Sequence, residues 1–377
     1  MAFFTPKGNK DVKLRKLGIL AGIALTATVA LAACGSDNGG GSASAGTSLA
    51  AGCVSGSLNG QGSSAQANAI AEWIKDFNTK CNNASTINYN PNGSGAGQQA
   101  FISGTADWAG SDSALQPADQ TSANARCKTG SAVHLPMVVG PIAVAYNLNG
   151  VTNLQFKPTT LAGIFSGKIT KWNDAAIAAD NPGVKLPATA IMAVHRSDSS
   201  GTTDNFTKYL AGTAGSAWTF DHDKVWKAPG GDAEKGSDGV SAQIKKTDGS
   251  IGYVEWSFAT LNSLSIAKIY NGAGEWSELS ADSAGKTIEG AQVTGTGNDL
   301  QMKIDYNTKT AGAYPIVLVT YEIVCDKGNT ASTLPLLKAF LTYTSSTDGQ
   351  SKLTSLGYAP LPETVRSKVA TTVSSLG

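Results

Sequence analysis

Short apolar segments alternate along this chain with segments of helical periodicity, and this alternation constrains the fold more than any other feature of the sequence. Val54–Leu58 has the pattern of a strand, and Ala67–Lys80 places its apolar residues on one helical face. The same order returns with a strand at Ser85–Tyr89, a second helix, and a brief strand at Ala106–Gly110. Such alternation indicates an α/β fold with a mostly parallel sheet, in which ligands bind at the carboxyl ends of the strands.

Two long apolar stretches divide the rest of the chain. Met137–Tyr146 contains a Gly-Pro break, and Tyr314–Val324 is apolar almost throughout. Two buried strands that bracket a middle region are what a discontinuous first domain with an inserted second domain requires. We therefore predict domain I at residues 54–143 plus 310–377 and domain II at residues 144–309.

The first 33 residues have the pattern of a targeting segment. Basic residues precede an apolar run at Leu17–Leu31, which is short for a membrane span. The ending L-A-A-C-G resembles a bacterial lipobox, which implies a signal peptide at residues 1–33 and lipidation of Cys34. The alternative is a cleaved signal without lipidation. Residues 34–52 are mostly Gly, Ser and Ala, so we expect them to form an unfolded tether.

The net charge argues against nucleic acid as a partner. The full chain has a formal charge of +1, and removing residues 1–33 takes away five Lys or Arg and one Asp, which leaves a charge of about −3. No stripe of Lys or Arg occurs in the sequence, whereas nucleic-acid binding needs a basic surface. An anion would therefore have to be bound locally, by backbone N–H groups and helix N-termini that point at it and by a small number of charged side chains.

Four cysteines remain once Cys34 is set aside, and an even number in an exported protein predicts two disulfides. Cys53, Cys81, Cys127 and Cys325 allow three pairings. We favour Cys53–Cys81 with Cys127–Cys325, because Cys53 opens the first strand and Cys81 ends the helix that follows it. The spacing matches no zinc motif, so we expect no metal site.

A polar loop within Val194–Tyr209 is the main candidate for a binding site. Here an apolar run gives way to R196-S-D-S-S-G-T-T and then to a helix, whose N-terminus leaves N–H groups unpaired and carries partial positive charge. Arg196 adds a full positive charge with a fork suited to phosphate-like oxygens, and Asp198 is placed to orient it. The alternative is that the hydroxyls only cap the helix and Arg196 forms a surface ion pair.

Three further loops share this chemistry. They contain Ser63 and Ser64, Ser94 and Gly95, and Asp112. Converging hydroxyls and helix N-termini can surround a tetrahedral oxyanion. Asp112 differs, because a carboxylate accepts hydrogen bonds and repels an anion that has no proton to donate. Phosphate carries a proton near neutral pH and sulfate does not, so Asp112 predicts selectivity for phosphate unless it only caps a turn.

Six motifs occur along the chain: G60-Q-G-S-S, N92-G-S-G-A-G-Q-Q, T105-A-D-W-A-G-S-D-S-A-L, I164-F-S-G-K-I-T-K-W-N-D, N181-P-G-V-K-L-P and R196-S-D-S-S-G-T-T-D-N-F. Through these motifs the chain resembles, over about residues 54–375, the substrate-binding lipoproteins of bacterial high-affinity phosphate ABC transporters. The resemblance implies a two-lobed α/β fold of the periplasmic-binding-protein (Venus flytrap) type, with a mixed sheet flanked by helices in each lobe and the ligand in the interdomain cleft. It also implies binding of inorganic phosphate outside the cytoplasm and its delivery to an ABC transporter permease and ATPase.

The resemblance extends to individual residues. It implies phosphate ligands at Ser64, Ala65, Ser94, Asp112, Arg196, Ser200, Gly201 and Thr202, with support from Ser63, Gly95 and Asp198. The family usually has Thr-Phe where this chain has Ser64-Ala65, so a hydroxyl and a backbone donor are retained but an aromatic wall is lost. A monomer, attached to the membrane only through a lipid anchor and without a cofactor, is the corresponding expectation.

Two other functions were compared with this one. A hydrolase would need a nucleophile motif, but no G-x-S-x-G occurs, and G163-I-F-S-G-K-I lacks the spacing and the Ser/Thr of a phosphate-binding Walker loop. We therefore expect no enzyme activity and a packing or hinge role for His195. The second alternative is an exported binding protein for phosphite, a phosphonate or sulfate, or a phosphate-scavenging surface protein. An organic ester would need room beyond an enclosed tetrahedral anion.

Overall fold

Residues 52–377 are described by a computed structural model of the chain. The predictions for the signal peptide at residues 1–33, for lipidation of Cys34 and for the tether up to residue 51 lie outside the described residues. The described residues belong to one unit by their contacts. None of their helices is long and apolar enough to cross a membrane.

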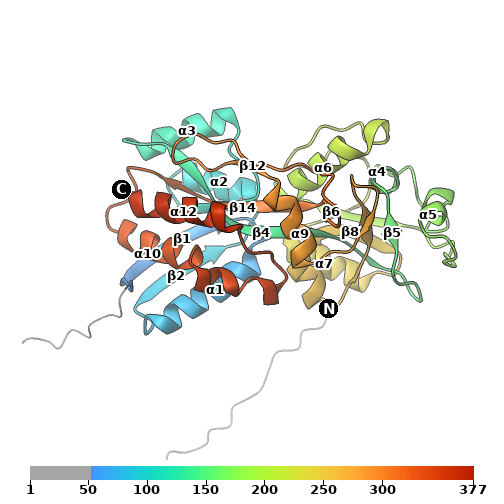
Figure 1. Ribbon diagram of the computed structural model, residues 1–377, viewed down its shortest axis with the longest axis horizontal. Coiled ribbons are helices and arrows are strands. Elements are labelled where there is room, and N and C mark those ends of the chain that lie inside the picture. The colour runs from blue at the N-terminus through green and yellow to red at the C-terminus, as the bar shows by residue number, and fades with distance from the viewer. Residues whose placement is uncertain (1–51) are drawn as a thin grey trace, which may run out of the picture. The chain divides into compact units, whose positions relative to one another are not determined.

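A nine-stranded mixed sheet organises the described residues, with strand order β2-β1-β3-β14-β4-β8-β6-β7 and with β9 paired to β4 (Figure 1). β1 is parallel to β2 and β3, and β6 is parallel to β7 and β8, as the alternation of strands and helices predicts. β14 and β4 are antiparallel to their neighbours and join the two parallel halves. The strands are β1 (Gly56–Gly62), β2 (Ser85–Asn90), β3 (Trp108–Ser111), β4 (Ala132–Asn147), β6 (Met192–Arg196), β7 (Asp232–Glu234), β8 (Ser250–Glu255), β9 (Ser265–Ile266) and β14 (Val317–Cys325).

β4 connects the two halves of the sheet. Residues 132–141 pair with β14, and residues 142–147 pair with β8, so the partner changes at the Gly140-Pro141 break. Every residue of β4 except the last is buried. The strand is longer at both ends than the predicted Met137–Tyr146, because its flanking residues also pair with β14 and β8. The two buried strands β14 and β4 thus lie between the two parallel halves, which gives the mixed, two-lobed α/β architecture expected from the sequence.

The first strand differs from its prediction. β1 begins at Gly56 rather than at Val54, and it continues past the predicted end at Leu58 to Gly62. The reason is close packing, since a Cβ on Gly60 would lie 2.3 Å from the Trp108 ring. Gly62 pairs with Gly110 in β3. Glycine is present here because the strands approach closely, and it does not mark a turn.

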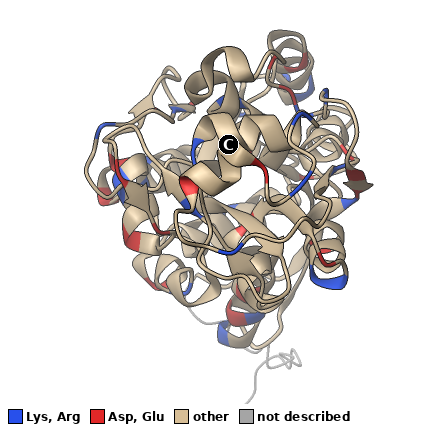
Figure 2. Cartoon of the chain, turned by 90° about the vertical axis from the view of Figure 1, so that its right-hand side faces the viewer, with Lys and Arg blue, Asp and Glu red and all other residues tan. Residues whose placement is uncertain are grey.

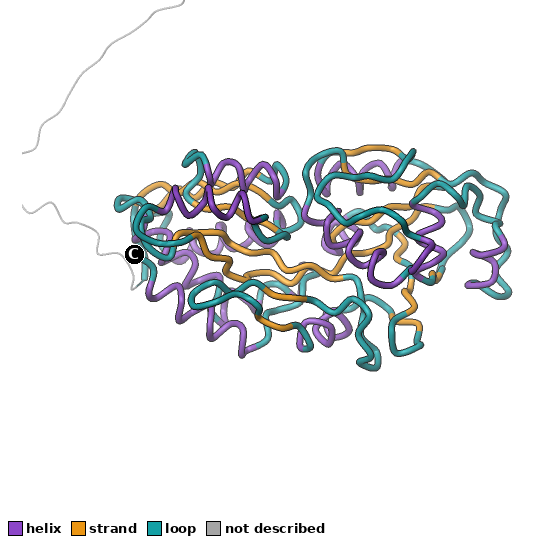
Figure 3. Tube along the Cα trace, turned by 90° about the horizontal axis from the view of Figure 1, so that it is seen from above, coloured by secondary structure: helices purple, strands orange, loops and turns teal. Residues whose placement is uncertain are grey.

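Helices lie on both sides of the strands (Figures 1 and 3). α1 has the bounds that the sequence predicts, and Ile70, Trp73 and Phe77 on its apolar face are buried. The helices are α1 (Ala67–Lys80), α2 (Ser94–Ile102), α3 (Pro117–Cys127), α4 (Pro158–Phe165), α5 (Ala175–Asp180), α6 (Gly201–Thr213), α7 (Gly236–Lys246), α8 (Trp256–Leu261), α9 (Ala281–Glu289), α10 (Leu334–Thr344), α11 (Thr347–Ser351) and α12 (Glu363–Ser375). The remaining strands form two small sheets, of β5 (Gln155–Phe156), β10 (Lys268–Tyr270) and β11 (Trp276–Ser277), and of β12 (Gln292–Val293) and β13 (Met302–Lys303).

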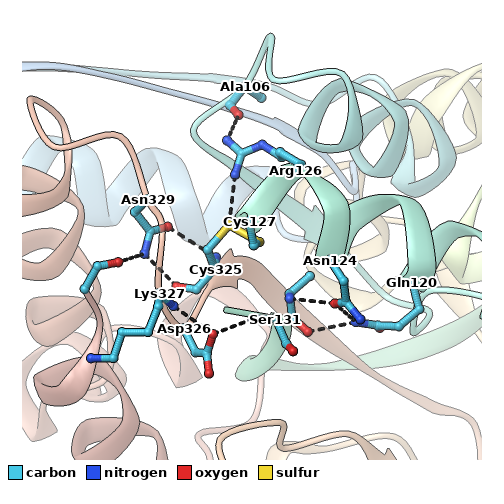
Figure 4. The surroundings of a disulfide bond; sticks show 12 residues. Ala106, Gln120, Asn124, Arg126, Cys127, Ser131, Cys325, Asp326, Lys327 and Asn329 are labelled. Carbon is cyan, nitrogen blue, oxygen red and sulfur yellow. Dashed lines mark hydrogen bonds between the residues drawn. A yellow bond between two sulfur atoms is a disulfide. The ribbon is translucent and has the colours of Figure 1, made fainter. Parts of the chain in front are cut away.

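The pairing Cys53–Cys81 with Cys127–Cys325, favoured from the sequence, is the one in the structure. The second bond joins the C-terminus of α3 to the end of β14 (Figure 4). Arg126 donates from Nη1 to Cys325 Sγ at 3.2 Å and from Nη2 to the carbonyl of Ala106 at 3.0 Å. The bond thus ties the last strand of the sheet to the helix that follows β3.

The long disulfide is expected to contribute more to stability than the short one. Cys127–Cys325 encloses a sequence separation of 198 residues and Cys53–Cys81 one of 28, so the long bond restricts the unfolded chain more. Replacing both cysteines of the long pair with alanine should lower the free energy of unfolding by about 5 kcal/mol, against about 4 kcal/mol for the short pair. Urea denaturation of the two double variants measures the difference. A larger loss for the short pair would contradict the prediction.

Candidate binding site

The predicted loops lie at the carboxyl ends of parallel strands in the two halves of the sheet. Ser63 to Ala65 follow β1, Asp112 follows β3, and Arg196 is the last residue of β6. Ser94 opens α2, and Ser200 caps α6. All the predicted ligand residues are buried.

Contacts bring the loops of the two halves together. The backbone N–H of Gly95 donates to the carbonyl of Ser199 at 3.0 Å. A Cβ on Gly201 would lie 2.6 Å from both Asp112 Cβ and Ser94 Oγ. The N-terminus of α6 therefore faces the Asp112 carboxyl and the start of α2 at van der Waals distance.

The Asp112 carboxyl is held by donors on several elements. Thr320 donates to Oδ1 at 2.7 Å, and Ser94 donates to Oδ2 at 3.3 Å. Burial raises the pKa of Asp112, and hydrogen bonds from Ser63, Thr320 and Ser94 and the charge of Arg196 oppose this increase. The carboxyl is thus a fixed acceptor rather than a turn cap, because its partners come from β14 and α2.

Arg196 is a buried cation with a bidentate partner. Its Nε donates to Asp198 Oδ1 at 2.7 Å and its Nη2 to Oδ2 at 2.5 Å, so Asp198 orients the guanidinium as the sequence predicts. Burial favours a higher pKa for Asp198, but the hydrogen bonds and charge of Arg196 and the N–H of Gly236 outweigh it and lower that pKa. The alternative of a surface ion pair is wrong, since the Arg196 side chain is only 2% exposed.

The N-terminus of α6 presents donors next to Arg196 and Asp112. Ser200 Oγ accepts the N–H of Thr203 at 3.2 Å, so that hydroxyl caps the helix. The N–H groups of Gly201 and Thr202 are in the first turn, where the helix supplies no acceptor. The hydroxyl of Thr202 is buried and has no hydrogen-bond partner within residues 52–377. Unpaired donors at a buried helix N-terminus beside an arginine are suited to an oxyanion.

Ser64 reaches a partner that the sequence analysis missed. Its Oγ lies 3.0 Å from Ser237 Oγ and accepts the N–H of Ser237 at 3.0 Å, at the start of α7. Gly236, the preceding residue, donates its N–H to Asp198 at 3.1 Å. A fifth strand-to-helix turn, G236-S-D, thus lies beside the first loop, and its Gly-Ser-Asp composition is the signal that could have found it.

The sequence analysis also did not identify Thr320 and Lys224 as residues that support the site. Thr320 lies where the register of β14 against β4 shifts, and such a bulge can re-aim a side chain. Its sequence signal is a hydroxyl inside an apolar strand. Lys224 accepts the N–H of Ser200 on its carbonyl at 2.8 Å, and its Nζ donates to Gln98 of α2. No pattern in the sequence around Lys224 indicates this contact.

The histidines are engaged elsewhere. His195 stacks on Trp226 with ring centroids 4.9 Å apart and an angle of 12°, which confirms its packing role. His134 and His222 pair with Asp299 and Asp204. Within the described part of the chain, no group of three or more His, Cys, Asp or Glu side chains is arranged to hold a metal ion.

Gly201→Ala is expected to weaken anion binding by about a hundredfold, because the new methyl group would collide with Asp112 and Ser94 and hold the two halves apart. Gly212→Ala is the matched control in the same helix, since no atom lies within 4 Å of its added Cβ. Calorimetric titration of both variants with phosphate measures the effect. Equal affinities for the two would show that the close approach is unimportant.

The chain is similar to known proteins over most of its length. Residues 47–348 match the model of a PBP superfamily domain. The chain is 43% identical over 372 residues to phosphate-binding protein PstS 3 of Mycobacterium leprae (strain TN), which covers 97% of this chain and 100% of the relative. It is 40% identical over 371 residues to phosphate-binding protein PstS 2 of Mycobacterium tuberculosis (strain ATCC 25618 / H37Rv), with the same coverage.

Solved structures of low sequence identity show the same fold. One is a high-affinity periplasmic phosphate-binding protein, PfluDING, bound with phosphate, with a TM-score of 0.69 and 22% identity over 84% of this chain and 93% of that chain. Another is a phosphate-binding protein from Stenotrophomonas maltophilia, with a TM-score of 0.63 and 19% identity. The chain therefore belongs to the PBP superfamily, in the family of the PstS phosphate-binding proteins.

Proposed function

We propose that this protein binds inorganic phosphate between the two halves of its sheet and delivers it to the permease and ATPase of an ABC transporter. The observation that supports this most is the combination of the Thr202 hydroxyl at the N-terminus of α6, unpartnered within the described residues, the buried Arg196 and the acceptor Asp112, which Thr320 and Ser94 hold in place. Donors alone would suit any oxyanion. An added obligate acceptor suits one that carries a proton, which is phosphate near neutral pH.

The proposed ligands are the residues expected from the family resemblance. They are Ser64, Ala65, Ser94, Asp112, Arg196, Ser200, Gly201 and Thr202, supported by Ser63, Gly95 and Asp198. The hydroxyls of the three serines among them already have partners, since Ser64 Oγ contacts Ser237, Ser94 Oγ donates to Asp112 and Ser200 Oγ caps α6. Each of these hydroxyls can still offer the anion its second lone pair or its proton, and the backbone of each loop can contribute as well. Residues 54–143 plus 310–377 and residues 144–309 are the proposed lobes that close on the anion.

Binding rather than catalysis is proposed for the site. The buried serines contact one another, Asp112 and backbone groups, while each histidine pairs with an aromatic ring or an acid elsewhere. A serine nucleophile needs a base within hydrogen-bond distance. The arrangement instead offers buried donors and one buried acceptor, held in place by their neighbours.

Residues 1–33 as a signal peptide, a lipid on Cys34 and a tether at residues 34–52 would place the binding unit at the outer face of the bacterial cell membrane. The lipid is the proposed membrane contact, and the protein is proposed to act as a monomer. The charges in Figure 2 support local recognition, because Lys and Arg are interspersed with Asp and Glu on the face shown. Such a surface provides no strong field for steering polyanions.

Calorimetric titration of the purified protein with phosphate, sulfate, phosphite and a phosphonate in parallel tests the proposed function. We expect phosphate to bind most tightly and sulfate to compete poorly. Tighter binding of phosphite or of a phosphonate would assign the protein to another oxyanion. Release of phosphate from an ester at a useful rate would point to an enzyme.

A further inference from the structure

A cluster of buried polar side chains lies beneath the first loop of the site. Glu322 is on β14, where it faces Gly110 of β3 and Leu135 of β4 in the register of the sheet. Its side chain lies against those of Gln66 and Trp108. Glu322 is 1% exposed, and Gln66 and Trp108 are fully buried, so solvent does not supply their hydrogen bonds.

Four polar atoms of this cluster have no hydrogen-bond partner within residues 52–377. They are Oε1 and Oε2 of Glu322, Oε1 of Gln66 and Nε1 of Trp108. Three are acceptors when Glu322 is ionised, and the indole N–H is their one donor. A buried acceptor without a donor is costly, and a buried charge more so.

The cluster continues into the site through a directed chain of hydrogen bonds. Gln66 Nε2 donates to Tyr89 Oη at 3.0 Å, and Tyr89 Oη donates to the carbonyl of Ser63 at 2.9 Å. A Cβ on Gly110 would lie 2.1 Å from Gln66 Nε2 and 2.3 Å from Tyr89 Oη, so this glycine makes room for the chain. The chain ends on the loop that carries Ser63 and Ser64.

A single added proton satisfies the whole cluster. A protonated Glu322 can donate its O–H to Gln66 Oε1 and accept the Trp108 indole N–H on its carbonyl oxygen. The Gln66 amide is then fixed with its NH₂ toward Tyr89, whose hydroxyl is left to donate to Ser63. We propose that Glu322 is a positioning residue, held as the neutral acid, that fixes the direction of the Gln66–Tyr89–Ser63 chain and thereby the first phosphate-binding loop.

Ionised Glu322 would reverse the chain. A carboxylate can only accept, so it leaves Gln66 Oε1 without a donor, and turning the amide over would bring its NH₂ to the carboxylate and its oxygen to Tyr89. The Tyr89 hydroxyl has one proton, and giving it to Gln66 deprives the Ser63 carbonyl of its donor. The loop would then lose the bond that orients it.

The surroundings favour the neutral acid near neutral pH. Burial raises the pKa of Glu322 to about 8, opposed by Gln66 and Trp108 and increased by the charge of Asp112. Tyr89 faces it from β2, and burial together with the charges of Glu322 and Asp112 raises the pKa of that phenol. The residues opposite Glu322 in the sheet, Gly110 and Leu135, carry no charge.

Glu322→Gln tests the proposal, because an amide mimics the neutral acid and cannot ionise. This inference rests on the proposed phosphate binding, so the wild-type protein is titrated first by calorimetry, and no binding there would defeat the proposed function alone. At pH 6.5 the variant should match the wild-type Kd within about twofold. At pH 9.5 it should bind about tenfold more tightly than the wild type, in which most of Glu322 is ionised. The ionisation of phosphate cancels in this ratio.

Tyr89→Phe is the second variant, since it removes the last donor of the chain and leaves Glu322 in place. We expect it to bind phosphate more weakly than the wild type, with a smaller further loss at pH 9.5. An infrared difference spectrum between wild type and Glu322→Gln, without phosphate at pH 6.5, should show the C=O band of a protonated carboxylic acid. A Kd ratio of Glu322→Gln to wild type that does not change with pH, or absence of the band, would overturn the proposal.

Discussion

Replacing Arg196 with methionine is expected to weaken phosphate binding by about a thousandfold. The guanidinium is the proposed cationic ligand of the anion and is 2% exposed beside Asp198, which is 12% exposed. Truncating one member of a buried, hydrogen-bonded charge pair costs about 2–5 kcal/mol, and about 4 kcal/mol corresponds to a thousandfold change in Kd. Here the remaining Asp198 carboxylate would also repel the incoming anion. Calorimetric titration with phosphate measures the loss.

The double variant Arg196→Met, Asp198→Asn separates the two causes. It removes the repelling carboxylate, so it should bind phosphate more tightly than Arg196→Met alone, although more weakly than the wild type. Asp198→Asn alone keeps the cation but loses its orientation, and a loss of about tenfold is expected. If Arg196→Met alone binds like the wild type, Arg196 is a structural residue and the ligand assignment is wrong.

The sequence predicts the parts of the site that depend on local structure. Strands followed by Ser- and Gly-rich helix starts identify Ser94, Arg196 and the N-terminus of α6, because a strand end and a helix N-terminus are both readable from the chain. The pairing of Arg196 with Asp198 is local as well, since only one residue separates them. The helix at Ala67–Lys80 follows from its apolar face.

Contacts that depend on the packing of distant segments could not be predicted. Ser64 meets Ser237, 173 residues further along the chain, because α7 begins beside the first loop. Thr320 reaches Asp112 across 208 residues, and it does so where the register between β14 and β4 shifts. Strand order and register are not written in local patterns. The end of β1 could not be predicted for the same reason. Its glycines look like turn residues in the sequence, and only the packing of Trp108 against Gly60 shows that they belong to a strand.

The two halves of the proposed site contribute different chemical groups. Arg196 and the start of α6 provide positive charge and donors, and they come from the half of the sheet that contains β6. Asp112, with its supports Thr320 and Ser94, comes from the half that contains β3. A tetrahedral anion held between them would meet donors on one side and a fixed acceptor on the other, so affinity and selectivity should respond to different substitutions.

Asp112→Asn is therefore expected to reduce the preference for phosphate over sulfate by about a hundredfold while changing total anion binding much less. In the proposed site the wild-type carboxylate would accept the proton of hydrogen phosphate and repel sulfate, which has none to donate. An amide in its place can donate to either anion, so sulfate should gain affinity. The measurement is the ratio of the two dissociation constants in wild type and variant at one pH.

Thr320→Val is the matched control for Asp112→Asn, because it removes the 2.7 Å hydrogen bond to Asp112 Oδ1 and leaves the carboxylate in place. Loss of this donor removes one of the interactions that hold down the raised pKa of Asp112, so the carboxyl should protonate at a higher pH. Thr320→Val should then keep the preference for phosphate at pH 8 and lose part of it as the pH falls, since a protonated Asp112 no longer rejects sulfate. Asp112→Asn should lack the preference at both pH values. An unchanged ratio of dissociation constants in Asp112→Asn would show that selectivity comes from the shape of the site and not from this carboxylate.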